Sequence, residues 1–310
     1  MQTIKEFDID AKPFLKWAGG KSKLINEIEL RFPKFIKESG KIEKYFEPFI
    51  GGGALFFYLM SNYDVSESYI YDINSELIVV YKTIQNNPHE LIDLLSEIKE
   101  RFIPKDHEDR KEFYLNIRKS FNEKLYDFDF ENYSQEFIER AAQIIFMNKT
   151  CFNGLFRVNK KGEFNVPFGK YKNPSIFDAE NIIAASVALK NTKIINASFL
   201  ESEQFIDENS LVYLDPPYRP LSKSSNFTSY SKFDFTDDDQ IELAKYYKRI
   251  SSSGAKVILS NSDPKNTDET DNFFDDLYGD FVIDRVKAPR MINCNGNKRK
   301  PVNEIIVRNY

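Results

Sequence analysis

The sequence predicts an α/β fold built around a mostly parallel β-sheet. Short runs rich in β-branched and aromatic residues recur along the 310 residues, and segments with helical spacing of apolar residues lie between most of them. Strands that alternate with helices are typical of parallel sheets, which bind ligands beyond the carboxyl ends of their strands. The seven predicted strands are residues 44–49, 68–72, 192–198, 211–215, 255–262, 281–286 and 303–310.

Two departures from simple alternation are visible. The last two predicted strands follow one another without a helical segment, so we expect them to form an antiparallel edge. Residues 74–191 offer helix after helix and little strand, which indicates an inserted helical unit. This insert ends in residues 150–174, where Lys161 and Gly162 separate two runs rich in aromatic and β-branched residues and predict a β-hairpin.

Composition limits the class of protein. The 41% of hydrophobic residues can fill a core, and no run of eighteen apolar residues indicates a membrane span. The first residues, MQTIKEFDID, have neither a basic leader nor an apolar signal core, so we expect a cytoplasmic protein. Two cysteines and two histidines are too few for a disulfide framework or a standard zinc cluster, and we expect no metal.

The charge distribution leaves a polyanion partner open, although the formal net charge is -5. Residues 157–172 carry five basic side chains against Glu163 alone, and residues 285–300 carry six with no acid. Two basic segments therefore lie on an acidic chain. Each is either a solvated loop or part of a polyanion-binding surface.

The segment KWAGGKSK near the N-terminus contains Gly-Lys-Ser but is not a phosphate loop. That motif needs a glycine where this chain has Leu15, and it should follow a strand. Gly19 and Gly20 would instead let the backbone approach a small ligand, with Trp17 and Lys21 at its rim. A helix-entry turn is the alternative.

The segment FEPFIGGGALFF places three glycines between a strand and a helix, and Asp72 ends the next predicted strand. A glycine turn under a nucleoside, with a carboxylate that accepts hydrogen bonds from it, has this arrangement. Phe56 stands where the dinucleotide fingerprint needs a third glycine, so a ligand without phosphate is favoured. S-adenosyl-L-methionine fits that description, and a plain loop is the alternative.

The stretch LVYLDPPYRP places an acid, two prolines and a tyrosine directly after a predicted buried strand. Proline lacks an N–H and restricts the preceding residue to an extended backbone conformation. Asp215 should therefore end the strand, and the backbone there should be rigid. A fixed carboxylate, an unclaimed carbonyl and an aromatic face suit a flipped base with an exocyclic amine. Asp215 and the Pro216 carbonyl would accept its N–H groups, and Tyr218 would stack on the ring. A plain strand-ending turn is the alternative.

These segments together resemble one family. PFLKWAGGKSKL, YFEPFIGGGALFF, YDINSELI, FNGLFRVNKKGEFNVPFGKY and YLDPPYRPLSKSSNFTSYSKFDFTDDDQ, in this order, are similar to the α-group N6-adenine DNA methyltransferases of the DNA adenine methylase (Dam) type, D12 class. The resemblance runs from about residue 13 to residue 310. It implies a seven-stranded, Rossmann-like sheet dependent on S-adenosyl-L-methionine, with an inserted helical target-recognition domain that carries the hairpin.

The resemblance also implies roles for individual residues. The catalytic loop would be Asp215, Pro216, Pro217 and Tyr218. The cofactor would be bound by Trp17, Ala18, Gly19, Gly20, Lys21, Glu47, Pro48, Phe49, Gly51, Gly53, Asp72, Ile73, Phe199 and Asp215. DNA would be contacted by Asn153, Leu155, Arg157, Asn159, Lys160, Pro167, Lys170, Tyr171, Asn226, Tyr230, Lys298, Arg299 and Lys300. Among these, Arg157 would read a guanine edge in the major groove.

The implied domains are a catalytic domain in two parts, residues 1–80 and 186–310, and a target-recognition domain, residues 81–185, with its hairpin at 151–172. The implied reaction is methyl transfer to N6 of a flipped adenine in double-stranded DNA, within GATC or a longer site beginning GAT. Such enzymes occur in bacteria and phages and can act alongside a restriction endonuclease without a stable complex. Methylation of RNA or of protein glutamine, or a catalytically silent DNA-binding module, are the alternatives.

Overall fold

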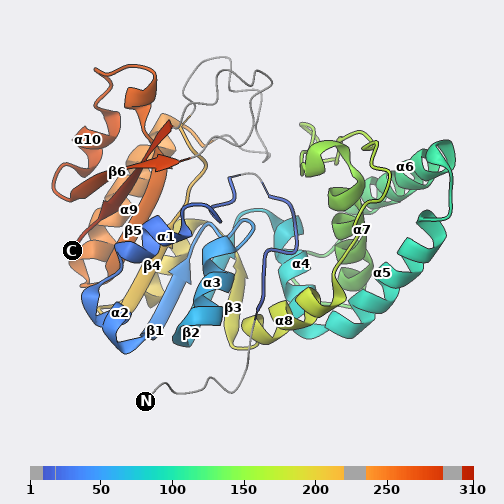
Figure 1. The fold of residues 1–310 in the computed structure, drawn as a ribbon, viewed down its shortest axis with the longest axis horizontal. Helices are drawn as coiled ribbons and strands as arrows, with labels where there is room; N and C mark the ends of the chain where they lie inside the picture. Colours follow the sequence, from blue (N-terminus) through green and yellow to red (C-terminus); the bar gives the residue numbers. More distant parts are fainter. Residues whose placement is uncertain (1–9, 18, 220–234, 289–301) are drawn as a thin grey trace.

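The computed structural model describes residues 10–17, 19–219, 235–288 and 302–310, and these contain a seven-stranded sheet. The strand order is β3-β2-β1-β4-β5-β7-β6, and the first five strands of that order are parallel (Figure 1). The predicted α/β class is therefore confirmed. The strands are β1 (Lys41–Glu47), β2 (Asp64–Asp72), β3 (Thr192–Asn196), β4 (Ser210–Leu214), β5 (Lys256–Ser262), β6 (Val282–Ala288) and β7 (Val302–Arg308).

The helices lie on both faces of the sheet and in the insert. They are α1 (Ile25–Leu30), α2 (Lys34–Ser39), α3 (Ala54–Asn62), α4 (Ser75–Asn86), α5 (Pro88–Phe102), α6 (His107–Glu123), α7 (Glu136–Thr150), α8 (Ala179–Leu189), α9 (Asp237–Ser252) and α10 (Phe273–Tyr278). Short 3₁₀ turns are η1 (Lys124–Tyr126), η2 (Phe152–Gly154), η3 (Phe199–Phe205) and η5 (Pro264–Asn266). None of the helices in the described ranges is long and apolar enough to span a membrane.

Strand β4 lies at the centre of the sheet, and all five of its residues are buried. A strand covered on both faces reads as a continuous apolar run rather than an alternating one, as SLVYL does. Its neighbours β1 and β5 run parallel to it, so the carboxyl ends of β1, β2, β4 and β5 lie along one edge of the sheet. That edge carries the glycine-rich and proline-rich segments of the sequence.

The last two strands form an antiparallel pair at one edge of the sheet, as predicted. Strand β7 inserts between β5 and β6 and is antiparallel to both, which leaves β6 outermost. The physical reason lies in burial. Ile305, Ile306 and Val307 are all buried and need a neighbour on each side, whereas Val282 on β6 is 42% exposed.

Helices α5, α6 and α7 lie on the side of the molecule opposite to β6 and β7, as Figure 1 shows. Helix α7 is buried along nearly its whole length and contacts α4, α5 and α6. Helix α4 packs against both α7 and the sheet strands β2 and β3. The insert therefore packs against the sheet chiefly through α4, and α8 contacts α3, α4 and α5.

A buried ion pair connects α4 to α7. The Arg140 guanidinium donates to both carboxylate oxygens of Glu76 and to the Phe121 carbonyl. Its carbon lies 4.1 Å from the Phe121 ring centroid and 4.6 Å from that of Phe128. Burial raises the pKa of Glu76, while Arg140 opposes the rise. The two charges are tolerated inside the insert because each is the main partner of the other.

We expect Arg140→Ala to lower the free energy of unfolding by about 3–5 kcal/mol, because it leaves the Glu76 carboxylate buried without its cation. The exposed pair Arg249 and Glu203 provides the control, and Arg249→Ala should cost less than about 1 kcal/mol. Urea unfolding at neutral pH measures both. Equal losses in the two variants would contradict the expectation, and Glu76→Leu combined with Arg140→Met should recover much of the lost stability.

Candidate functional site

The proline-rich loop begins where β4 ends and holds a carboxylate against two donors. Asp215 Oδ1 accepts a hydrogen bond from Ser260 Oγ at 3.1 Å and lies 2.9 Å from the Lys21 ammonium nitrogen. Burial raises the pKa of Asp215, and the neighbouring Lys21 opposes that rise. Gln240 Nε2 donates to the Pro217 carbonyl at 3.1 Å, which ties the loop to α9. The carboxylate is therefore held in a defined position.

Tyr218 completes this cluster. The Lys21 ammonium lies 4.1 Å from the centroid of the Tyr218 ring, and the Tyr218 hydroxyl donates to Glu304 Oε2 at 2.5 Å. Lys21, which the sequence predicts at the cofactor, here lies between Asp215 and the face of Tyr218. Ser260 and Glu304 were not predicted at all, since each lies within an ordinary strand pattern on β5 or β7.

The glycine loop lies at the carboxyl end of β1, and Trp17 covers it. Gly51 has φ 46° and Gly53 has φ 69°, a region that side chains disfavour. A Cβ at Gly51 would lie 3.1 Å from the Trp17 ring, and one at Gly53 would lie 2.5 Å from the Tyr81 hydroxyl. The backbone here thus has no room for side chains.

Asp72 at the end of β2 faces the same loop. Its carboxylate accepts the Gly51 N–H at 3.1 Å and the Asn74 N–H at 2.9 Å, which leaves lone pairs for further donors. Burial raises the pKa of Asp72 to about 6, although the two backbone bonds oppose the rise. The next side chain, Ile73, is 53% exposed. This group fits a ligand that brings hydroxyls or N–H donors and an apolar face, and it would repel a phosphate.

An aromatic pair lies beside these loops. Phe49 and Phe199 stack with centroids 5.3 Å apart, and Phe235 meets Phe49 edge-on at 5.8 Å. Glu47 and Pro48 are buried behind the loop. The Tyr45 hydroxyl donates to Glu47 at 2.7 Å, and burial raises the pKa of Glu47 well above its usual range. Glu47, which is expected at the cofactor, is therefore a buried acid at the end of β1.

The N-terminal segment connects the glycine loop to the insert. Trp17 stacks on Phe156 with centroids 5.5 Å apart, while its other contacts are with Gly51 and Gly52. The Lys16 backbone exchanges two hydrogen bonds with the Asn148 side chain, and Asn148 also donates to the Gly154 carbonyl. Gly19 and Gly20 are exposed, and the Gly19 carbonyl accepts from the Lys21 ammonium at 2.8 Å.

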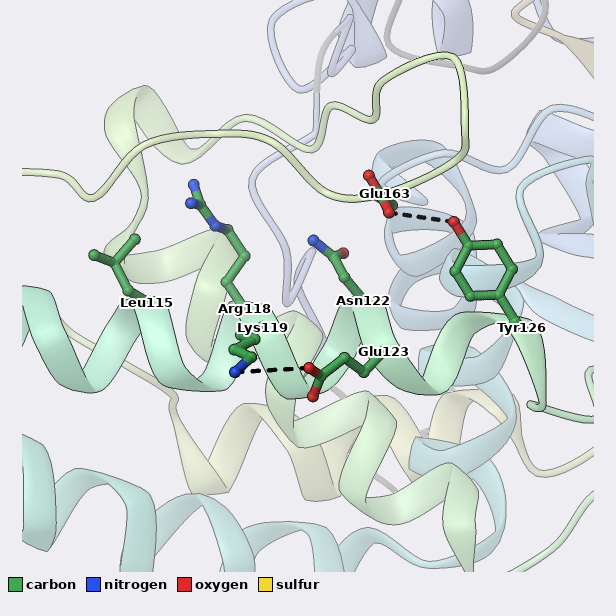
Figure 2. A pocket seen from close by; sticks show the side chains of 7 residues that line it. All are labelled: Leu115, Arg118, Lys119, Asn122, Glu123, Tyr126 and Glu163. Carbon is green, nitrogen blue, oxygen red and sulfur yellow. Dashed lines mark hydrogen bonds and ion pairs between the residues drawn. The ribbon is translucent and has the colours of Figure 1, made fainter.

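The predicted hairpin turns at Lys161 and Gly162, and its two arms pair antiparallel but irregularly, through the isolated bridges Cys151 to Phe168 and Val158 to Phe164. A continuous ladder does not form, because side chains of α6 bond the backbone groups of Phe164 and Val166. Figure 2 shows Arg118 and Asn122 pointing from α6 to this loop across a groove of about 360 Å³. Arg118 donates to the Val166 carbonyl, and Asn122 bonds both the N–H and the carbonyl of Phe164.

The residues of this loop that are expected to contact DNA differ in their exposure and in their partners. Asn153 has φ 59° and is exposed, as are Lys160, Pro167 and Lys170. Arg157 is half-buried and its Nε donates to the Asn165 amide oxygen at 2.8 Å, so no carboxylate in the described part of the chain neutralises it. The others are Leu155 and Asn159, which are half-buried, and Tyr171, whose ring lies 5.1 Å from the Lys16 ammonium.

Some expected site residues cannot be placed. Ala18, Asn226, Tyr230, Lys298, Arg299 and Lys300 lie outside the described residues. Within the second basic segment, Arg285 donates to Asp263 and to Asp275, so its charge is already balanced. Among the described residues no group of three or more histidine, cysteine or acidic side chains could hold a metal ion.

The segments that the sequence predicts at a ligand thus lie along one edge of the sheet. The glycine loop and Asp72 form a cradle that fits a nucleoside at the ends of β1 and β2. Asp215 and the ring of Tyr218 lie at the end of β4. Residues 17–292 match the model of the D12 class N6 adenine-specific DNA methyltransferases. The chain belongs to this family. As an adenine-specific DNA methyltransferase it acts on DNA, which agrees with the exposed basic loop beside the cradle.

Named relatives cover nearly the whole chain. A type II methyltransferase of Methanocaldococcus jannaschii is 50% identical over 303 residues, which are 97% of this chain and 100% of the relative. A type II methyltransferase of Lactococcus lactis subsp. cremoris is 39% identical over 312 residues, covering 100% and 99%. The DNA adenine methylase of Escherichia coli is 35% identical over 295 residues, covering 95% and 94%.

The raised pKa of Asp72 has a consequence for stability. Because burial raises this pKa from 3.8 to about 6, the folded methyltransferase retains a proton that the unfolded chain releases. The resulting contribution to stability is present below about pH 4 and is lost as pH rises through about 6. Asp72→Asn removes it, so wild type should lose stability relative to this variant over that interval. Urea unfolding of both proteins between pH 4 and 6 measures this loss. A difference in free energy of unfolding between wild type and Asp72→Asn that stays constant over this range would contradict the expectation.

Proposed function

We propose that this chain transfers a methyl group from S-adenosyl-L-methionine to N6 of an adenine flipped out of duplex DNA. We propose GATC, or a longer site beginning GAT, as the target. The observation that carries the reaction is the Asp215 carboxylate, which lies beyond the end of β4 and already accepts the Lys21 ammonium as a donor. An adenine amine offers the same kind of donor to the same oxygen.

The residues of the proline-rich loop would activate the adenine amine by orienting it. The amine is a poor nucleophile because its lone pair is delocalised into the base. Asp215 and the Pro216 carbonyl would accept its two N–H groups and favour a pyramidal nitrogen, and Tyr218 would stack on the base. No donor to the Pro216 carbonyl is present within the described part of the chain. The acceptor is thus available for a substrate.

The cradle residues would hold the methyl donor. Asp72 would accept ribose hydroxyls, the Gly51 backbone would approach the ligand closely, and Ile73 with Phe199 would pack on its adenine. S-adenosyl-L-methionine would supply an electrophilic methyl group on a sulfonium. The absence of phosphate from this cofactor agrees with the carboxylates that line the cradle.

We further propose that residues 81–185 form the target-recognition domain, between catalytic parts 1–80 and 186–310. The packing of α5, α6 and α7 away from the sheet supports this division, and α4 runs through the first boundary (Figure 1). Because two relatives are named type II methyltransferases, we also propose cytoplasmic action alongside a restriction endonuclease, without a stable complex.

Asp215→Ala tests the reaction. Removing the carboxylate takes away one of the two acceptors, so kcat for transfer of labelled methyl groups to duplex DNA should fall by at least roughly 10²-fold. Equilibrium binding of S-adenosyl-L-methionine should persist, because the cradle residues are intact. Transfer by Asp215→Ala at the wild-type rate would overturn the assignment, and absence of transfer by wild type to any DNA would overturn the function.

Arg157→Ala tests base reading. A bidentate contact to guanine discriminates by about 1–3 kcal/mol, so kcat/KM on a GATC duplex should fall by roughly 5- to 150-fold and discrimination against duplexes altered at one position should relax. Lys160→Ala is the matched control, because a lysine that only contacts phosphate weakens all duplexes evenly. If both variants lose activity evenly on every duplex, Arg157 does not read a base.

A further inference from the structure

Glu304 reaches the catalytic loop from a strand far away in the sequence. It lies on β7, opposite Ser262 of β5 and Val286 of β6, and is 86 residues from Tyr218. Its Oε2 accepts the Tyr218 hydroxyl at 2.5 Å. No role in the proposed reaction has been assigned to it so far. The contact therefore needs its own explanation.

The contact controls how the Tyr218 ring lies. A side chain that follows two prolines has a fixed backbone, but its own torsions can still turn the ring. A hydrogen bond from a phenol to a carboxylate contributes about 1.5–3 kcal/mol, enough to select one ring orientation. In that orientation one face of the ring meets the Lys21 ammonium at 4.1 Å, beside Asp215. The ring is thus held next to Lys21 and the acceptor carboxylate, with the ammonium over one of its two faces.

A carboxylate at position 304 is not there for stability of the sheet. Glu304 is half-buried in a strand whose neighbours Ile305 and Ile306 are fully buried and apolar. Burial raises the pKa of Glu304, a cost that the Tyr218 hydroxyl and the Lys21 ammonium reduce. An apolar residue would pack at this position without that cost. Its partners, Tyr218 and Lys21, both belong to the candidate active site.

We propose that Glu304 is a positioning residue, which acts through the Tyr218 hydroxyl to hold the ring as the stacking surface for the target adenine. This inference rests on the proposed function. Glu304 does not itself touch the base. Its removal and removal of the Tyr218 hydroxyl should therefore have the same effect, and the two effects should not accumulate.

The experiment is a double-mutant cycle of Glu304→Ala and Tyr218→Phe, measured by methyl transfer to a target duplex. Each single variant should lower kcat by roughly 10- to 100-fold, and the double variant should lose no more than the worse single one. The KM for S-adenosyl-L-methionine should change little, because Asp72 and the glycine loop make no hydrogen bond to Glu304 or Tyr218 within the described residues. Glu304→Gln, whose amide oxygen still accepts from a hydroxyl, should recover most of the activity.

A second readout is independent of turnover. A duplex with 2-aminopurine at the target position reports stacking of the flipped base, and Glu304→Ala and Tyr218→Phe should change its fluorescence equally. Losses that multiply in the double variant, or Glu304→Gln as impaired as Glu304→Ala with both variants folded, would overturn the proposal. Wild-type transfer in the same assay separates this failure from failure of the proposed function.

The chain offers a matched control for the chemistry of the change. On β2 the Tyr69 hydroxyl donates to Glu67 at 2.7 Å, the same kind of contact at a distance from the catalytic loop. Glu67→Ala should leave kcat unchanged. A loss in Glu67→Ala equal to that in Glu304→Ala would show a general effect of the missing carboxylate and would overturn the specific role of Glu304.

Discussion

A carboxylate held largely out of water at the end of β4 is the constraint on which the rest of the site depends. The backbone at Asp215 is fixed in position, because two prolines follow it and β4 is buried along its whole length. Its charge is disfavoured by burial, so a cation must approach. Lys21 supplies that cation from the other end of the chain. The N-terminal segment is therefore obliged to cross the carboxyl edge of the sheet.

This crossing also determines where the basic loop lies. The backbone that delivers Lys21 passes Trp17 between the glycine loop and Phe156, and bonds to Asn148 at the end of α7. Asn148 holds the Gly154 carbonyl, where the loop begins. One short segment thus contacts the cradle, the catalytic carboxylate and the loop that bears Arg157. Recognition and chemistry are joined by packing rather than by a flexible linker.

Functional residues at strand ends could be predicted from the sequence, whereas the residues that contact them in the fold could not. Asp72 and Asp215 could be identified because each closes a predicted strand next to a glycine or proline turn, and parallel strand ends share one edge. Ser260 and Glu304 could not, because their partners lie 45 and 86 residues away and a strand pattern shows burial but not partner choice. The predicted hairpin forms, but it pairs irregularly for a similar reason: Asn122 and Arg118 bond part of its backbone from α6.

The distribution of charge explains how an acidic protein can select an amine from a polyanion. Four acids, Glu47, Asp72, Asp215 and Glu304, have pKa values raised by burial around the strand ends. Such a site repels phosphate and favours ligands that bring N–H or O–H donors. Arg157, whose partner is an amide rather than a carboxylate, would keep its charge for the proposed contact with DNA. In the proposed reaction a base would enter the site only after leaving the phosphate backbone at the rim, which is the separation that base flipping would achieve.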